Sequence, residues 1–337
     1  SQTIKLEADG NAITFYYYKN VELTANPGTA TYDGTMHSVS GFTGAPEGAD
    51  FSAITVGASG TDASTYPANF PEGTVNTVDA TGKYIVTTAT DGSLVINKRS
   101  VTLSSEEAHK TYNSTPLTKP DVTVTGDGFV EGEVTDLKAT GSVTNVNQGK
   151  VKNTITYTKG ENFNADNYNI ISNEGELWID PVTTEITIVI TGHNDGREYD
   201  GTEHVVSGYD ISGLPAGVSQ SDVGFNGTAE VKQTDAGTYP MGLDSNQFYL
   251  KSPAVENYNN VTYDVRDGKL AIAQRTVKLS SETASKPYDG EPLTKPDVKI
   301  DAGSFVNGEV TEIRATGSVT NVSEGEVTNT IVYTVHE

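Results

Sequence analysis

The chain has 337 residues, no cysteine, one tryptophan and a formal net charge of −23. This charge argues against binding to nucleic acid or to an anionic membrane surface, because both need clustered Lys and Arg. The absence of cysteine excludes disulfides, thiolate metal sites and thiol catalysis, and no run of about 18 apolar residues is present that would insert into a membrane.

The first 20 residues differ from the rest of the chain. They contain GNAITFYYYKN (residues 10–20), in which four consecutive aromatic residues alternate between the two faces of an expected strand. No later segment matches this one, so we interpret residues 1–20 as the closing strands of an upstream domain. Tyr16 and Tyr18 are candidates for a platform that stacks on a sugar or a partner, and a contact between domains is the alternative.

The remaining chain consists of two alternating repeats. RSVTLSSEEA begins at Arg99 and RTVKLSSETA begins at Arg275, and 37 of the 60 positions that follow from these two residues are identical. A second pair, YDGTMHSVSGF and YDGTEHVVSGY, begins at Tyr32 and Tyr199. Regular self-similarity marks repeated structural units. We therefore predict four modules, namely A1 (residues 21–98), B1 (99–181), A2 (182–274) and B2 (275–337), and we expect B2 to lack its last strand.

The local patterns predict strands throughout. NTITYT (residues 153–158), GELWI (175–179) and EITIVIT (185–191) are alternating or β-branched and are bounded by Gly, Asn and Asp. Several short strands in each repeat of about 80 residues predict an all-β fold, with four tandem immunoglobulin-like β-sandwich modules in an elongated array. A β-grasp module is the alternative, and it needs a helix for which no helical stripe is present.

A tyrosine-corner motif occurs in both A modules. TDASTYPANF (residues 61–70) and TDAGTYPMGL (234–243) have the spacing of this corner, in which a tyrosine hydroxyl binds back to the main chain. Ala68 and Met241 stand where immunoglobulin domains place a cysteine, and we expect them to fill that space. In the B modules, Val151 and Val327 replace the corner tyrosine.

Several motifs carry a resemblance to a known repeat family. YDGTEHVVSGY, YDGEPLTKPDV, GFVEGEV (residues 128–134) and ADNYNI (165–170) resemble the MBG and YDG repeats of large Gram-positive surface proteins. The opening segment resembles the tail of a MucBP-like repeat. The resemblance implies extracellular display at a bacterial cell wall, often in gut commensals, and no enzymatic activity. Asn113-Ser114 and Ala63-Ser64 depart from the family pattern at two turns.

No catalytic motif is present. The chain lacks G-x-S-x-G, H-E-x-x-H and Gly-rich phosphate loops. His37 and His204 occupy equivalent positions after the Tyr-Asp-Gly turns, which favours a structural role. His109, His193 and His336 have no equivalent in another module. We therefore predict a non-enzymatic protein without a cofactor.

Two acidic stretches are candidates for structural calcium. GHNDGREYDG (residues 192–201) and DGFVEGE (127–133) gather oxygen ligands, but neither has the EF-hand spacing, and solvated turns are the simpler interpretation. Isopeptide bonds between Lys110 and Asn153, and between Lys286 and Asn329, are a further hypothesis that the sequence leaves open.

Binding residues are expected where the modules differ. Asp235 follows Tyr199 by 36 positions, whereas Asp62 follows Tyr32 by 30, so A2 carries a longer loop region. Loops on a rigid sandwich are common recognition sites. The candidate partner-binding residues are Tyr209, Asp210, Leu214 and Phe225 in this region, together with Trp178, which stands where A1 has Val95 and A2 has Ala271. Burial at a module junction is the alternative for Trp178.

Three functional hypotheses follow. The first is a monomeric stalk and adhesion module of a secreted or cell-wall-anchored bacterial surface protein. The second is a dedicated binder of a host extracellular protein such as immunoglobulin. The third is a module that binds mucin or other glycans.

Overall fold

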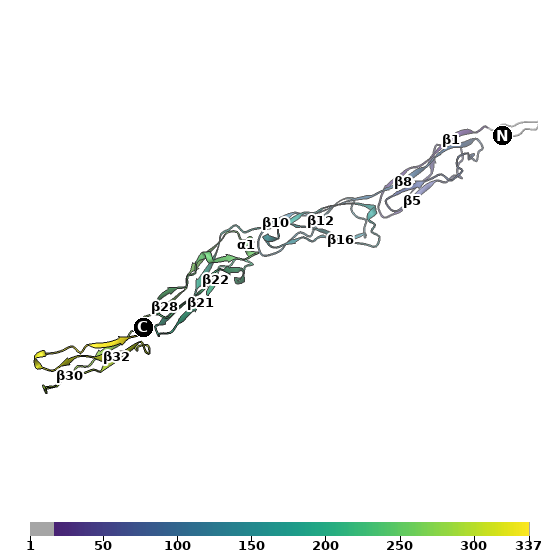
Figure 1. Cartoon of the computed structure of the whole chain (residues 1–337). Helices are drawn as coiled ribbons and strands as arrows, with labels where there is room; N and C mark the ends of the chain where they lie inside the picture. The colour runs from purple at the N-terminus through teal and green to yellow at the C-terminus, as the bar shows by residue number, and fades with distance from the viewer. Residues whose placement is uncertain (1–16, 337) are drawn as a thin grey trace, which may run out of the picture. The chain divides into compact units, whose positions relative to one another are not determined.

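The computed structural model describes residues 17–336, and this part of the chain is nearly all β (Figure 1). It consists of tandem immunoglobulin-like β-sandwich modules, as the sequence predicts. The longest α-helix among the described residues, α1 (Ala254–Asn257), has four residues, so the helix that a β-grasp fold requires is missing from this part. No helix found there is long and apolar enough to cross a membrane.

The chain forms two compact units. The second consists of Thr111–Thr115, Asn145–Asn147 and Asp180–Glu337, and the first contains the remaining residues. Every strand pairing connects strands of the same predicted module. Most of the segment that resembles a MucBP-like repeat, including Tyr16, lies outside the described residues.

Module A1 is built from eight strands, and the first and last segments of the module run side by side. The strands are β1 (Lys19–Ala25), β2 (Gly28–Thr31), β3 (His37–Ser40), β4 (Phe42–Thr43), β5 (Gly57–Gly60), β6 (Thr65–Ala68), β7 (Tyr84–Thr90) and β8 (Gly92–Asn97). They form the sheets β4-β1-β7, β2-β8-β6 and β3-β5, with β1 parallel to β7 and β2 parallel to β8. Strand β1 begins two residues before the predicted start of A1, and its Lys19 and Asn20 pair with β7.

Module B1 repeats this plan and adds the strand pair β13-β16. Its strands are β9 (Arg99–Ser105), β10 (Ala108–Thr111), β11 (Leu117–Thr118), β12 (Val122–Gly126), β13 (Val134–Ala139), β14 (Ser142–Val143), β15 (Val151–Lys152), β16 (Ile155–Lys159), β17 (Tyr168–Asn173) and β18 (Glu176–Asp180), with 3-10 turns η1 (Val146–Gln148) and η2 (Ala165–Asn167). Strand β9 lies between β12, which is antiparallel to it, and β17, which is parallel to it.

Module A2 has the A1 plan and an additional strand pair. It contains β19 (Ile186–Gly192), β20 (Asn194–Glu198), β21 (His204–Ser207), β22 (Tyr209–Ser212), η3 (Gln220–Asp222), β23 (Val223–Phe225), β24 (Glu230–Gln233), β25 (Gly237–Pro240), η4 (Ser245–Gln247), β26 (Phe248–Leu250), α1, β27 (Val261–Arg266) and β28 (Lys269–Ala273). Strand β23, in the longer loop region, forms a separate antiparallel pair with β26.

Module B2 contains fewer strands than B1 among the described residues. They are β29 (Lys278–Ser281), β30 (Leu293–Thr294), β31 (Val298–Ala302), β32 (Val310–Ala315), β33 (Ser318–Val319) and β34 (Ile331–Val335), with the turn η5 (Val322–Glu324). They pair as β29-β31, β30-β33 and β32-β34. Within residues 17–336, β29 pairs with β31, the counterpart of β12.

Modules A1 and B1 share one hydrophobic core. A single residue, Lys98, separates β8 from β9. One cluster of buried side chains combines residues from both modules, namely Tyr32, Leu94 and Ile96 of A1 with Val101, Leu103 and Tyr168 of B1. Burial of each such side chain contributes on the order of 1.5–3 kcal/mol. Each module is therefore stabilised in part by its neighbour within this unit.

The predicted tyrosine corners are confirmed. The Tyr66 hydroxyl donates to the backbone oxygen of Asp62 at 3.0 Å, and the Tyr239 hydroxyl donates to that of Asp235 at 3.2 Å. Ala68 and Met241 are buried, at 1% and 7% exposure. The corner is held by one hydrogen bond and by packing.

Candidate functional site

A buried carboxylate joins modules A1 and B1. Glu133, which is 4% exposed, accepts a hydrogen bond from the Tyr32 hydroxyl on Oε1 at 2.5 Å and one from the Tyr168 hydroxyl on Oε2 at 2.6 Å. Tyr168 also accepts from the backbone N–H of Val130 at 3.0 Å. The two tyrosine rings meet edge to face at 5.6 Å. Both oxygens of this charge are therefore satisfied by phenols from two different modules, as a buried charge requires.

Burial raises the pKa of both phenols. It raises the pKa of Tyr32 to about 12, and the hydrogen bond to Glu133 acts in the same direction. The pKa of Tyr168 is raised above its ordinary value for the same two reasons, in the same order. Both groups thus remain protonated donors well above neutral pH.

A buried asparagine completes this joint. Asn167, which is 1% exposed, accepts from the backbone N–H of Ala63 at 2.7 Å and donates to the Asp62 carboxylate at 2.8 Å. Both partners lie in the corner loop of A1. The Asn167-Tyr168 pair of B1 therefore contacts the corner loop of A1 and Tyr32, the tyrosine of the A1 Tyr-Asp-Gly turn.

Part of this arrangement recurs inside the second compact unit, where the Tyr258 hydroxyl donates to the backbone oxygen of Ala216 rather than to a carboxylate. Asn257, which is 1% exposed, accepts from the backbone N–H of Val146 at 2.8 Å and donates to the Asn145 side chain at 2.9 Å. Tyr258 packs edge to face on Tyr112, with ring centroids 5.4 Å apart. The sequence analysis did not single out these two asparagines, although both pairs read Asn-Tyr in the sequence.

Two of the predicted partner-binding residues belong to an aromatic cluster of A2. Tyr209 packs on Phe225 at 5.3 Å and on Phe248 at 5.2 Å, and Phe225 stacks on Phe248 at 4.8 Å. Tyr209 and Phe225 are half-buried. These rings hold the longer loop region of A2 against β26.

The other residues predicted in this loop region are more accessible. Asp210 is exposed, and its carboxylate lies 3.6 Å from Nε2 of His193. Leu214 is half-buried. Tyr249, on the neighbouring β26, is 43% exposed, so the surface beside the cluster offers an aromatic ring to solvent. The binding role of these residues stays a prediction.

Trp178 lies on a sheet surface of B1 between two side chains. His109, from β10, stacks on its ring at 4.7 Å, and the Lys150 ammonium lies 4.5 Å from the ring centroid. Lys150 also pairs with Glu176 at 3.0 Å. Strands β10 and β15 flank β18 in this sheet, so the indole is held from both sides by its own module. Its role as an anchor for a partner stays a prediction.

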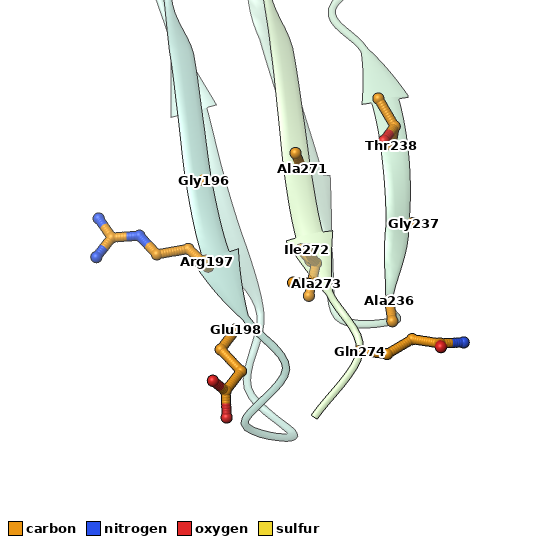
Figure 2. A pocket seen from close by; sticks show the side chains of 10 residues that line it. All are labelled: Gly196, Arg197, Glu198, Ala236, Gly237, Thr238, Ala271, Ile272, Ala273 and Gln274. Atoms are coloured by element: carbon orange, nitrogen blue, oxygen red, sulfur yellow. The ribbon is translucent and has the colours of Figure 1, made fainter. Parts of the chain in front are cut away.

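The matching surface of A2 carries small residues. Gly196 and Thr238 are the register partners of Ala271, and they line an open pocket of about 800 Å³ over strands β20, β28 and β25 (Figure 2). The side chains of Arg197, Glu198 and Gln274 lie around its lower end in Figure 2. This pocket contains no constellation of catalytic groups.

The acidic stretches are used for internal contacts. Asp195 pairs with Arg197 at 2.8 Å, and Asp200 accepts from His204 at 3.0 Å, as Asp33 does from His37. Across residues 17–336, no group of three or more acidic or histidine side chains is placed to hold a metal ion. His37 and His204 thus have the matching turn contacts that a structural role predicts.

Asn153 is a buried structural asparagine. Its side-chain amide accepts from Gly141 N–H at 3.0 Å and donates to the backbone oxygens of Glu106 at 3.2 Å and Lys119 at 2.8 Å. Asn329 makes the equivalent three bonds in B2, with Gly317, Glu282 and Lys295. These contacts hold loops together, and the isopeptide hypothesis stays a prediction.

Comparisons with known proteins add little to this picture. No protein-family model and no curated protein matches the chain. Among solved structures, a domain tandem from titin is 9% identical and covers 75% of this chain and 97% of its own, with a TM-score of 0.21. The N-terminal eight Ig domains of Down syndrome cell adhesion molecule are 11% identical over 91% of this chain, which covers 47% of that chain, with a TM-score of 0.15. Neither similarity is strong enough to carry an argument.

Proposed function

We propose that this chain is a stalk and adhesion segment of a secreted or cell-wall-anchored bacterial surface protein. It acts without catalysis, and its tandem modules hold a binding surface at a distance from the cell wall. The resemblance of its motifs to MBG and YDG surface repeats supports this location.

The observation that carries the stalk proposal is the buried joint between A1 and B1. Flexible linkers in surface proteins are long and rich in Gly or Ser, whereas here one residue separates the two modules. A shared core and a buried Glu133 with two tyrosine donors oppose bending at this boundary. A segment that bears load or keeps a fixed spacing needs resistance to bending between its modules. A protein that only binds a partner in solution does not need it.

Single-molecule fluorescence energy transfer tests the stalk proposal. The chain has no cysteine, so Glu47→Cys in A1 and Lys138→Cys in B1, both at exposed positions, provide two specific labelling sites. We expect one narrow distance distribution, which broadens when Asn167→Ala is added. A broad distribution in the unmodified joint would contradict the stalk proposal.

A dedicated host-protein binder is the second candidate. The aromatic cluster of A2 and the exposed Tyr249 beside it favour this candidate, because exposed tyrosines on a rigid frame are common at binding surfaces. Immunoglobulin and mucin glycoproteins are the host proteins to test first.

A pull-down from intestinal secretions tests this candidate, with the intact chain as bait and mass spectrometry as readout. If the chain is a dedicated binder, one dominant host protein is retained, and Tyr249→Ala reduces its recovery about tenfold or more, as for a hot-spot residue. Met36→Ala, at another exposed apolar position in A1, is the control. Competition by free sugars would instead assign the activity to glycan binding. Recovery no higher than with an unrelated β-sandwich bait would contradict the host-binding candidate and leave only the stalk proposal.

A further inference from the structure

Modules A1 and B1 each contain a pair of parallel strands that joins the start of the module to its end. In A1, β1 pairs with β7 and β2 pairs with β8. In B1, β9 pairs with β17. The chain enters each parallel pair at one end and leaves it at the opposite end. Tension along the chain therefore pulls the two strands past each other, and it loads the evenly spaced hydrogen bonds of the pair together rather than one after another.

The chain passes from the A1 pair to the B1 pair through a single residue. Lys98 separates β8 from β9, so tension that leaves the A1 pair enters the B1 pair without a flexible linker that could extend first. The Arg99 side chain closes this passage, because it donates to the backbone oxygens of Tyr32 at 3.2 Å and of Gly128 at 2.6 Å. The two parallel pairs are thus connected in series and carry equal load.

The buried joint is attached to the load-bearing strand β17 of B1. Tyr168 is the first residue of β17, and Asn167 directly precedes it. Asn167 binds the corner loop of A1, and Tyr168 shares the Glu133 carboxylate with Tyr32. A slip of β17 along β9 by one residue moves it by about 3.3 Å, which is more than these hydrogen bonds tolerate. Failure of the B1 pair therefore also removes Asn167 and Tyr168 from A1.

The joint is attached to the load-bearing strands of A1 as well. Tyr32 directly follows β2, and its backbone N–H donates to the oxygen of Asn97, at the end of β8, at 2.9 Å. When β2 slides along β8, Tyr32 is drawn away, and the buried Glu133 loses one of its two phenol donors. A buried charge that has lost a partner is strongly unfavourable. The core that the two modules share opens at the same time, since Tyr32 and Tyr168 both belong to it.

We propose that A1 and B1 form one mechanical unit, in which the two parallel pairs and the buried joint yield together under tension. This inference rests on the stalk proposal and deepens it, since it concerns load carried along the chain. The unit holds until one parallel pair slips, and that slip removes contacts that the other module needs. A state in which one of the two modules is folded and the other is extended therefore does not persist under load.

Optical tweezers test this proposal on the intact chain. The chain has no cysteine, so Tyr18→Cys and Thr183→Cys, both at exposed positions, attach DNA handles on either side of A1 and B1 alone. We expect a single rupture that releases about 50 nm, which is the extended length of roughly 160 residues less their folded length. Two successive ruptures of about 25 nm each in the otherwise unmodified chain would overturn the proposal.

Two variants of the joint are expected to divide this rupture into two of about 25 nm. Glu133→Ala removes the carboxylate that the two tyrosines share. Asp62→Ala removes an acceptor of Asn167 from an exposed position of A1, so it tests the joint even if the buried substitution prevents folding. Glu131→Ala, at an exposed position, is the matched control and should keep the single rupture. A single rupture in both joint variants would show that the joint does not couple the modules and would overturn the proposal.

The direction of pulling tests the role of the parallel pairs. Handles at Tyr18→Cys and Lys83→Cys lie at the same end of β1 and β7, where Lys19 opposes Tyr84, so they peel this pair open one bond after another. Because forced unfolding follows the unfolding rate under load, we expect peeling to lower the rupture force about twofold or more relative to handles at Tyr18 and Thr183. Equal rupture forces in the two geometries would show that the parallel pairs do not carry the load, and would overturn the proposal.

Failure of the mechanical unit is distinguishable from failure of the stalk proposal. Energy transfer between the two labels measures bending at the joint without load, whereas the tweezers measure how the modules fail under load. A narrow distance distribution together with two separate ruptures would support the stalk and refute the mechanical unit. A broad distribution would contradict the stalk whatever the rupture pattern.

Discussion

Glu133→Ala is expected to lower the local free energy of unfolding at the A1/B1 joint by about 2–5 kcal/mol. The substitution leaves the buried hydroxyls of Tyr32 and Tyr168 without their acceptor, and each buried hydroxyl without a partner costs about 1–3 kcal/mol. Hydrogen exchange read by mass spectrometry on the intact chain measures this loss segment by segment. It should appear in β17 and around Tyr32, while module A2 is unaffected.

Glu131→Ala is the matched control for this variant, because Glu131 is an exposed carboxylate two positions away. It is expected to change the local free energy by less than about 0.5 kcal/mol, as surface substitutions do. Equal effects of the two variants would show that the carboxylate at position 133 does not hold the joint.

The same joint is expected to weaken at high pH. The folded joint raises the pKa of Tyr32 to about 12 from an ordinary value of 10.0, so the folded state keeps a proton that the unfolded state releases. The stabilisation is therefore complete below about pH 10 and is lost as the pH rises from about 10 towards 12. Tyr32→Phe cannot ionise at this position and should show a smaller decline over this range in the same exchange measurement.

Asn153→Ala is expected to destabilise module B1 by about 3 kcal/mol or more. Three loops converge on this fully buried amide, and its loss leaves Gly141 N–H and the oxygens of Glu106 and Lys119 unpaired. Gly141 allows this approach, since a Cβ there would lie 2.7 Å from Oδ1 of Asn153. Asn169→Ala, at an exposed position of the same module, provides the control and should have little effect.

Asn153→Asp should be worse than Asn153→Ala at neutral pH. Its carboxylate would face two backbone oxygens in a buried site, which disfavours the charged form and raises the pKa of the new group in the folded state. The destabilisation should therefore grow as the pH rises above about 4, the unfolded value. Urea unfolding at two pH values, with hydrogen exchange used to read the unfolding of the B1 segments, measures this pH dependence. A destabilisation that does not depend on pH would show that the new group is not buried as an anion.

The repeated motifs predicted the fold well because they are local. The Asp-x-Gly-x-Tyr spacing in A2 fixes a hydrogen bond between residues four positions apart, so pattern alone was sufficient. The alternating segment GELWI (residues 175–179) likewise predicted a strand, and β18 lies there with Leu177 and Ile179 buried. Strand boundaries were predicted less closely, since the segment at residues 185–191 compares with β19 at Ile186–Gly192.

The joints could not be predicted because their partners are far apart in sequence. Tyr32 and Glu133 are separated by 101 positions, and nothing in the pattern around either residue identifies the other. Glu133 resembled a calcium ligand or a solvated turn residue within an acidic stretch, yet it is buried against two phenols. The aromatic residues Tyr209 and Phe225 were chosen for their place in a variable loop, but pattern alone does not reveal that Phe248 packs against them.

The dependence of A1 on Tyr168 has a consequence for the order of events during synthesis. The ribosome adds residues from the N-terminus at roughly 5–20 per second, so Tyr32 is made several seconds before Glu133 and still longer before Tyr168. During this interval, the nascent A1 module exposes an unpaired tyrosine, a free corner loop and part of an unfinished core. Module A1 is thus completed only after Glu133 and Tyr168 of B1 have been made.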